Sequence, residues 1–193
     1  MKTVPPHEAV AALKAGRVAL VPTETVVGLV AAESGLPRIR EIKGRDANKP
    51  IALLCASAQE AFELTANVPP LAEHLAELYW PGPLTLVLNL PSGGTIGMRV
   101  PAGKAVRELL EAYGGPLYAT SANVSGESAS AAPEEVDPQV VEAVDLVVEG
   151  GPGSGEASAV VDLSGGKVQL LRANNALSTQ KLAHLVSEST APE

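Results

Sequence analysis

The stretch RVALVPTETVVG at residues 17–28 joins an apolar run to a cluster of polar groups. The apolar run predicts a buried strand, which Pro22 ends because proline lacks the N–H that a strand ladder needs. Two β-branched hydroxyl residues, Thr23 and Thr25, then flank the carboxylate of Glu24. A plain turn does not need these groups, so either they cap the chain locally or they face a polar ligand.

Length and composition indicate one globular domain. A chain of 193 residues is long enough to bury a core and short for two independent domains, so we expect a single domain over residues 1–193. With 46% hydrophobic but only 3% aromatic residues, its core must consist mainly of Ala, Val and Leu. The net charge of −8 argues against broad nonspecific attraction to nucleic acid, although a basic pocket can lie within an acidic protein.

The sequence pattern predicts a cytoplasmic protein. Acidic and prolyl residues precede the first apolar stretch, unlike in a signal peptide, and no apolar run approaches the roughly 20 residues of a membrane span. The single cysteine, Cys55, excludes an internal disulfide and a cysteine-based zinc cluster. Its place in PIALLCAS predicts a small, buried hydrophobic side chain at the end of a strand.

Helical and strand patterns alternate along the chain. Helices are predicted over residues 8–14, 37–43, 58–64, 71–79, 105–113 and 178–188. Strands are predicted over residues 17–21, 50–55, 83–90, 95–101, 116–121, 158–163 and 167–172. Two segments rich in Ser, Ala, Gly and Pro, 124–138 and 149–158, are expected to be loops of the kind that carry function. The fold class is therefore α/β (mixed α+β), with helices packed on a twisted sheet.

Polar residues outside the predicted helices fall at strand ends or just beyond a helix, where ligands bind in open sheets. They are Thr23, Thr25, Lys43, Arg45, Lys49, Thr95, Arg99, Thr120, Ser121 and Asn123. Hydroxyls, an amide and four cations suit phosphates and carboxylates. Arg99, between apolar neighbours, is costly to bury unless an anion meets it. That anion is either a ligand or an internal acid such as Glu24 or Asp162.

Taken singly, these segments also have simpler interpretations. KGRDANK at 43–49 is compatible with a solvated loop whose cations favour a helix C-terminus, and TSANVSGES at 120–128 with an ordinary polar turn. Walker, GxGxxG, HExxH and GxSxG motifs do not occur. The histidines His7, His74 and His184 lie in predicted helices without ligand spacing, and we interpret them as surface or interface residues.

Six blocks taken together are more specific than any one of them. They are VPTETVVGL (21–29), IREIKGRDANKPIALL (39–54), WPGPLTLVL (80–88), IGMRVP (96–101), PLYATSANVSGE (116–127) and SAVVDL…VQLLR (158–172). In order and spacing they resemble the YrdC/Sua5 family of threonylcarbamoyl-adenylate synthases over about residues 15–172. The resemblance implies the short, single-domain branch of that family, with a YrdC-like twisted sheet and a concave anion-binding cleft.

The resemblance also implies a reaction and its residues. L-threonine, bicarbonate and ATP would give threonylcarbamoyl-AMP and pyrophosphate, a nucleotidyltransferase reaction that supplies the tRNA t6A modification. Lys43 and Arg45 would be catalytic; Thr25, Arg99, Ser121 and Ser158 would bind threonine; Arg45, Lys49, Thr95, Asn123 and Arg172 would bind ATP. Mg2+ is expected to accompany ATP, held by phosphates and water. The product would pass to the tRNA threonylcarbamoyl-transfer machinery.

Two alternatives to this enzyme remain open. One is a non-catalytic RNA-binding or ribosome-associated paralogue with the same fold, and the other is a domain that handles a carbamoyl adenylate for fused partner domains. A few positions also depart from the family's common residues, namely Val27, Ala159 and the Ala173-Asn174 pair. The first stands where the family commonly has an aromatic residue, and the second where it has threonine.

Overall fold

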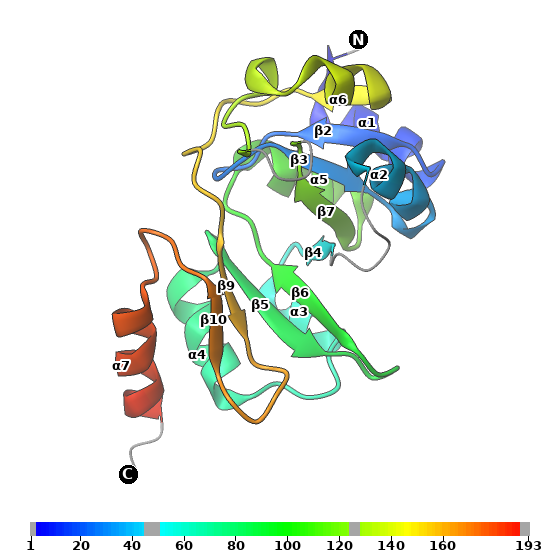
Figure 1. The fold of residues 1–193 in the computed structure, drawn as a ribbon. Helices are drawn as coiled ribbons and strands as arrows, with labels where there is room; N and C mark the ends of the chain where they lie inside the picture. The colour runs from blue at the N-terminus through cyan, green and yellow to red at the C-terminus, as the bar shows by residue number, and fades with distance from the viewer. Residues whose placement is uncertain (1–2, 45–50, 124–127, 190–193) are drawn as a thin grey trace.

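The computed structural model describes residues 3–44, 51–123 and 128–189, which form one mixed sheet with helices around it (Figure 1). The strands are β1 (Thr3–Val4), β2 (Val18–Val21), β3 (Gly28–Ala31), β4 (Ala52–Leu54), β5 (Leu84–Asn89), β6 (Thr95–Arg99), β7 (Leu117–Ser121), β8 (Leu146–Val148), β9 (Ala159–Asp162) and β10 (Gln169–Arg172). The helices are α1 (Pro6–Lys14), α2 (Leu36–Lys43), α3 (Ala58–Glu63), α4 (Pro70–Tyr79), α5 (Lys104–Tyr113), α6 (Pro138–Ala143) and α7 (Thr179–Ser189), with short 3-10 turns η1 (Glu33–Gly35) and η2 (Pro133–Glu135). The predicted α/β (mixed α+β) class is confirmed.

The ten described strands follow the order β1-β8-β2-β3-β7-β4-β6-β5-β9-β10. Four neighbouring pairs are parallel (β1 with β8, β8 with β2, β4 with β6, β5 with β9), and the other five are antiparallel. The three-residue strand β4 lies at the middle and pairs with β7 on one side and β6 on the other. It therefore joins two halves of the sheet, β1-β8-β2-β3-β7 and β6-β5-β9-β10.

Each half has its own hydrophobic core. Helices α1 and α5 cover one face of the first half through residues such as Leu13 and Leu109, and α2 and α6 cover the other face through Ile39 and Val140. Helices α3, α4 and α7 pack against the second half, where Leu75 is fully buried. A space between the two halves is lined by residues of both.

Local sequence signals explain where the helices begin and end. Proline occupies the first turn of α1, α2, α4 and α6, where a missing N–H costs no hydrogen bond. Gly44 and Gly114 end α2 and α5 in the left-handed conformation, with φ of 55° and 77°. Ser178 accepts a hydrogen bond from the Lys181 N–H at 3.2 Å and so caps the last helix.

The predicted helices and strands are confirmed to within a few residues, but four elements, β1, β3, β8 and α6, and the two 3-10 turns were not predicted. Strand β3 begins at Gly28, shortly after the polar turn of residues 23–25, where the sequence pattern indicated no strand. Strand β8 has only three residues, and α6 only six. The expected loop 124–138 contains η2 in its described part, and the expected loop 149–158 contains no helix or strand. No described helix is long and apolar enough to cross a membrane.

Cys55 lies directly after β4 and is fully buried, as predicted. Burial, and to a lesser extent the carboxylate of Glu60, raises the pKa of its thiol to about 12. The side chain therefore behaves as a small hydrophobic group in the core of the second half of the sheet.

Candidate functional site

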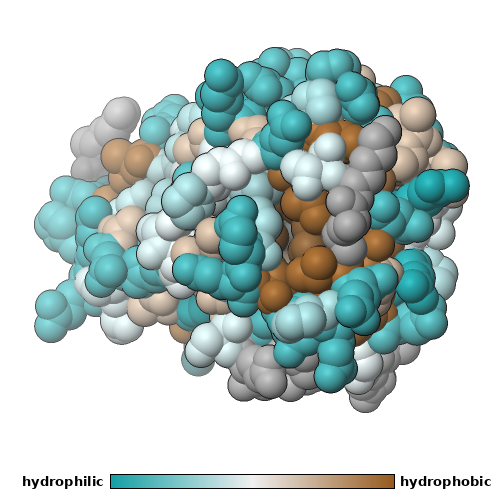
Figure 2. All heavy atoms as spheres, turned by 90° about the horizontal axis from the view of Figure 1, so that it is seen from above, coloured by the Kyte–Doolittle hydropathy of each residue, from teal (hydrophilic) through white to brown (hydrophobic). Residues whose placement is uncertain are grey.

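A cleft of about 810 Å³ lies between the two halves of the sheet, and we refer to it as the cleft. Strands β3, β4 and β7 and helix α2 contribute one side of its lining, and β5, β6, β9 and β10 contribute the other. In Figure 2 the molecule seen from above has a hollow with apolar walls, shown in brown, and a largely hydrophilic rim. The charged residues of its described lining are Arg40, Arg99, Arg172 and Asp162. The cleft is thus locally basic in a protein of net charge −8.

The polar turn of residues 23–25 forms a directed chain of hydrogen bonds. Thr23 Oγ1 donates its single proton to the Val26 carbonyl at 2.7 Å and accepts the Thr25 N–H at 3.2 Å. The contact of 2.9 Å between the two threonine hydroxyls must then be donated by Thr25. Thr25 is 2% exposed, and its oxygen can only accept further hydrogen bonds. The hydroxyl groups of the turn therefore donate their protons within the turn, and Thr25 Oγ1 remains a hydrogen-bond acceptor in the lining of the cleft.

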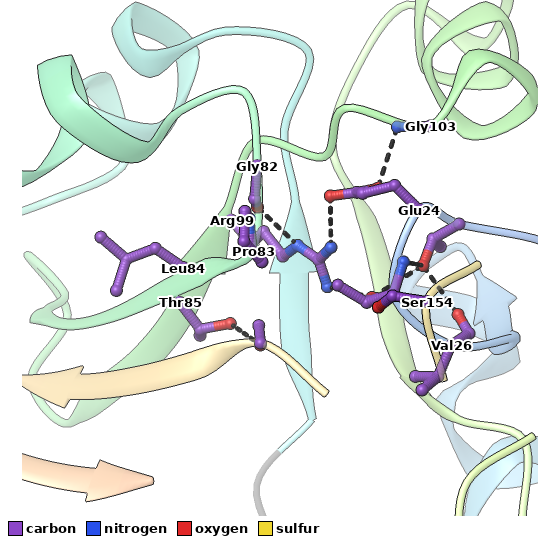
Figure 3. A network of polar contacts seen from close by, with 12 residues as sticks. Glu24, Val26, Gly82, Pro83, Leu84, Thr85, Arg99, Gly103 and Ser154 are labelled. Atoms are coloured by element: carbon purple, nitrogen blue, oxygen red, sulfur yellow. Dashed lines mark hydrogen bonds and ion pairs between the residues drawn. The ribbon is translucent and has the colours of Figure 1, made fainter. Parts of the chain in front are cut away.

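Arg99, at the end of β6, reaches across to this turn and is 7% exposed (Figure 3). Its Nε donates to the Gly82 carbonyl at 3.0 Å and its Nη1 to Thr25 Oγ1 at 2.9 Å. Its Nη2 forms an ion pair with Glu24 Oε1 at 2.5 Å. The counter-charge inside the protein is therefore Glu24, one of the two internal acids considered from the sequence. A guanidinium has five N–H groups, so two remain for a ligand.

Glu24 is held on both carboxylate oxygens. Oε2 accepts the Gly103 N–H at 2.9 Å, while Oε1 meets Arg99 (Figure 3). Burial by itself would raise the pKa of Glu24, but the charge of Arg99 and hydrogen bonds from the backbone outweigh it and lower the pKa. Glu24 is therefore an ionised residue that holds the Arg99 guanidinium in place.

A second polar group lies on the other side of the cleft. Thr85 Oγ1 and Ser158 Oγ are 2.8 Å apart, and both side chains are buried. Arg172 Nε donates to the Ser158 carbonyl at 2.7 Å, and its Nη2 lies 3.3 Å from Ser158 Oγ. Burial, followed by repulsion from Arg99, lowers the pKa of Arg172. Two guanidinium groups that repel one another within one cleft favour the binding of an anion near both.

Lys43 connects the end of α2 to the end of β7. Its Nζ donates to the Ser121 carbonyl at 2.6 Å, to Asn123 Oδ1 at 2.9 Å and to the Asn123 carbonyl. Ser121 Oγ in turn donates to Asn123 Oδ1 at 2.5 Å. Lys43 is 2% exposed and stands behind the lining of the cleft. This geometry gives Lys43 the task of positioning Ser121 and Asn123, and its predicted catalytic role stays a prediction.

The structure brings most of the predicted site residues together. Those in the lining of the cleft are Thr25, Arg99, Ser121, Ser158, Thr95 and Arg172. Asn123 lies next to Ser121, and Lys43 contacts both. Arg45 and Lys49 lie outside the described residues. Contributions thus come from five separate parts of the sequence, as expected from strand ends that meet at one crevice.

Among the polar residues of the lining that sequence reasoning missed are Thr85 and Arg40. Thr85 belongs to the WPGPLTLVL block, where a single hydroxyl inside an apolar strand was the available signal. Arg40 was counted only as part of a predicted helix, and its neighbour Arg38 shares its chemistry. Helix periodicity alone does not tell which of the two faces a cleft.

Departures from the family's common residues have local structural explanations. Val27 and Ala159 are both fully buried in the cores on either side of the cleft. Asn174 accepts the N–H groups of Ala176 and Leu177 through Oδ1 and donates to the Pro83 carbonyl at 3.0 Å. It therefore shapes the turn that leads to α7.

Among the described residues that line the cleft, one carries a carboxylate. Among the described residues, no group of three or more His, Cys, Asp or Glu side chains is arranged to hold a metal ion. Asp162 is the cleft's carboxylate, and its Oδ1 accepts both the N–H and the O–H of Ser164. An ion that arrives on a ligand's phosphates, with water as its other ligands, suits this site better than an ion in a protein cage.

Fold and cleft define an α/β protein with a basic, hydroxyl-lined crevice between two halves of a mixed sheet. A family model for Sua5, YciO and YrdC, described as "Telomere recombination", matches residues 11–174. The chain belongs to the Sua5/YciO/YrdC family, which confirms the resemblance found in the sequence.

Individual relatives give the same result. The threonylcarbamoyl-AMP synthase of Pyrococcus abyssi is 35% identical over 173 residues, which cover 83% of this chain and 51% of the relative. The bovine (Bos taurus) threonylcarbamoyl-AMP synthase is 35% identical over 190 residues, covering 88% of this chain and 67% of the relative. The crystal structure of P. abyssi Sua5 complexed with L-threonine has a TM-score of 0.88 at 30% identity, over 97% of this chain and 61% of that one. The chain spans about half the length of the P. abyssi relative.

Proposed function

We propose that the protein is an L-threonylcarbamoyladenylate synthase. It would convert L-threonine, bicarbonate and ATP to threonylcarbamoyl-AMP and pyrophosphate, and the adenylate would serve tRNA t6A modification. The proposal rests chiefly on one observation, the Arg99–Thr25–Glu24 cluster at the end of a hydroxyl-lined cleft. A second support is the 30% identity of the chain to P. abyssi Sua5, which was crystallised in complex with L-threonine.

The threonine subsite lies, in this proposal, between the polar turn and the pair Thr85–Ser158. Arg99 has two N–H groups left to donate to a carboxylate, and Thr25 Oγ1 can accept from an ammonium or hydroxyl group. Because Glu24 already neutralises Arg99, a zwitterion fits there better than a ligand of high net charge. Ser121 and Ser158 would complete the contacts to the amino acid.

The nucleotide would occupy the remainder of the cleft. Thr95 and Arg172 lie in its lining, and Asn123 is held beside it by Lys43. Arg45 and Lys49 are assigned to the nucleotide by the family resemblance. Mg2+ would enter with ATP, where it neutralises phosphate charge, and Asp162 is the described carboxylate close enough to the cleft to assist through water.

Chemistry in such a site depends on position and charge. The neutral amine of threonine forms a bond to the bicarbonate carbon, and an amine proton and the bicarbonate hydroxyl leave as water. An oxygen of the resulting carbamate then attacks the α-phosphorus, and pyrophosphate leaves with the electrons of the broken P–O bond. Holding together three reactants that each carry an anionic group lowers the barrier through proximity and charge neutralisation. This explains how the reaction proceeds with arginine and hydroxyl groups in the described lining and without a catalytic histidine there.

Pyrophosphate release provides the test. The purified protein is incubated with Mg·ATP, bicarbonate and each amino acid in turn, and pyrophosphate is measured with a coupled phosphatase assay. We expect release only when threonine and bicarbonate are both present, together with a product whose mass is that of threonylcarbamoyl-AMP. Transfer to tRNA requires the addition of the threonylcarbamoyl-transfer proteins.

Other outcomes would identify other functions. Pyrophosphate release without threonine would contradict the assigned substrate. No release, together with tight and salt-sensitive binding of RNA, would favour the RNA-binding paralogue. The net charge of −8 argues against that result, since phosphate contacts require a surplus of basic residues.

A further inference from the structure

We propose that Arg40 is an additional ligand-binding residue of the cleft and that it contacts the polyphosphate chain of the nucleotide. That the nucleotide is ATP rests on the proposed function. The evidence for a ligand contact at Arg40 comes from the structure of this chain alone. Arg40 has a buried, polar nitrogen in the cleft that nothing in the described protein satisfies.

Arg40 is partly buried on α2 and belongs to the lining of the cleft. Its Nε is shielded from solvent and has no hydrogen-bond partner, and the guanidinium forms no ion pair with any residue in the described ranges. Buried guanidinium nitrogens are normally paired, since leaving a donor unmet costs more than the net gain of a typical hydrogen bond. A donor left unmet inside a binding cleft is available to a ligand.

The neighbouring arginine on the same helix behaves differently. Arg38 is exposed, forms an ion pair with Glu41 at 2.8 Å and donates to the Ala143 carbonyl at 2.9 Å. Arg38 therefore connects α2 to the end of α6, whereas Arg40 lines the cleft and has no counter-charge among the described residues. Arg38 thus has a structural role, and Arg40, two positions further on, is available to bind a ligand.

The charges in the cleft identify the ligand group. Glu24 compensates Arg99, whereas Arg172 is bonded to Ser158 oxygens and Arg40 to nothing in the described protein. Arg40 enters from α2 on one half of the sheet, and Arg172 from β10 on the other (Figure 1). A group with several negative charges spread over a distance can meet both, and a triphosphate has this form. An amino-acid carboxylate carries a single charge, so it suits Arg99, whose own charge Glu24 already compensates.

Binding measurements on Arg40→Gln test the assignment without relying on turnover. Dissociation constants for Mg·ATP, pyrophosphate, AMP and L-threonine are measured by calorimetry on the full chain. We expect Mg·ATP and pyrophosphate to bind about tenfold more weakly, the usual loss for one charge-assisted hydrogen bond, with AMP and threonine unchanged. In steady-state kinetics the KM for ATP should rise while the KM for threonine stays constant.

Arg107→Gln is the matched control, because Arg107 is an exposed arginine whose nearest acid, Glu111, is 3.9 Å away. It should leave all four constants unchanged. Arg40→Gln should also keep the wild-type melting temperature, since no protein partner is lost. An equal loss for AMP and ATP, a loss for threonine, or a lowered melting temperature with unchanged pyrophosphate affinity would overturn the proposal.

The outcome is separable from that of the proposed function. If the wild type releases no pyrophosphate from threonine and bicarbonate but binds Mg·ATP more tightly than Arg40→Gln does, the synthase is wrong and the polyphosphate contact stands. If the wild type binds neither Mg·ATP nor pyrophosphate, the assignment of Arg40 is overturned whatever the reaction.

Discussion

Glu24 and Arg99, 75 positions apart in the sequence, form a salt bridge of 2.5 Å that spans the two halves of the sheet. Glu24 follows β2 in the first half, and Arg99 ends β6 in the second. Arg99→Ala is expected to destabilise the fold, because that change leaves the partly buried Glu24 carboxylate without its cation and removes two further hydrogen bonds. Substitutions that retain shape are therefore the better probes of this pair.

Glu24→Gln is expected to lower the free energy of unfolding by about 2 kcal/mol. The amide retains the shape but leaves Arg99 without a counter-charge at a position that is only 7% exposed. The value lies below that for a fully buried pair, because the Glu24 side chain is 23% exposed. Urea titration at pH 7 measures the change. Glu77→Gln, an exposed position on α4, is the control, and an equal effect in both variants would show that the pair contributes nothing.

The same pair predicts a dependence of stability on pH. The pKa of Glu24 is lower in the folded protein than the ordinary value of 4.5, so the unfolded chain binds the proton more readily. The contribution of the pair is then complete above about pH 4.5 and is lost as the pH falls through the lowered pKa. The difference in unfolding free energy between wild type and Glu24→Gln should shrink below pH 4.5. A difference that is constant from pH 7 to pH 3 would contradict the assignment.

Gly153→Ala is expected to disturb the threonine subsite. A Cβ at Gly153 would lie 2.4 Å from the Thr25 carbonyl oxygen and 2.6 Å from that of Thr23, and neither backbone atom can move away cheaply. We expect a loss of about 1–3 kcal/mol in stability and weaker threonine binding.

The neighbouring substitution Gly151→Ala is a matched control, since a Cβ there meets no atom within 4 Å. Calorimetric titration with threonine compares the two variants. Equal threonine affinities for both would show that the close approach at Gly153 does not support the turn.

Cys55 should resist thiol reagents in the folded protein. With its pKa raised to about 12, the thiolate fraction at pH 8 is roughly a thousandfold below that of a free cysteine, and burial restricts access further. Reaction with Ellman's reagent should be negligible in buffer and rapid in 8 M urea, where urea supplies the positive control. Labelling of the native protein at the rate of the unfolded chain would show that the buried environment opens readily.

Much of the fold follows from local signals in the sequence. Apolar runs bounded by proline or glycine located β2, β5 and β6, and helical spacing located α4 and α7, because these signals act within a few residues. Strand β3 was missed because its first residue, Gly28, favours a turn when seen without its partners. In the structure Gly28 pairs with Val21 and Ser121, and a Cβ there would contact nothing closer than 3.6 Å.

The site was predictable in its composition but not in its pairings. Residues at strand ends indicated which side chains gather, and Thr25, Arg99 and Ser121 do line one cleft. The sequence left the partner of Arg99 open among a ligand, Glu24 and Asp162, since contacts over 75 positions depend on the tertiary arrangement. The same limit applies to Lys43, whose acceptors lie 78 and 80 positions away.

The brevity of β4 has a mechanical consequence. In the described sheet, three residues carry the hydrogen-bonded connection between its halves, and they pair with β6 at only two registered positions. The angle between the halves, and with it the width of the crevice, thus rests on few backbone bonds. A ligand that contacts both sides of the crevice connects the two halves of the sheet. Ligand binding should therefore reduce the motion of the whole protein as well as that of the residues that touch the ligand.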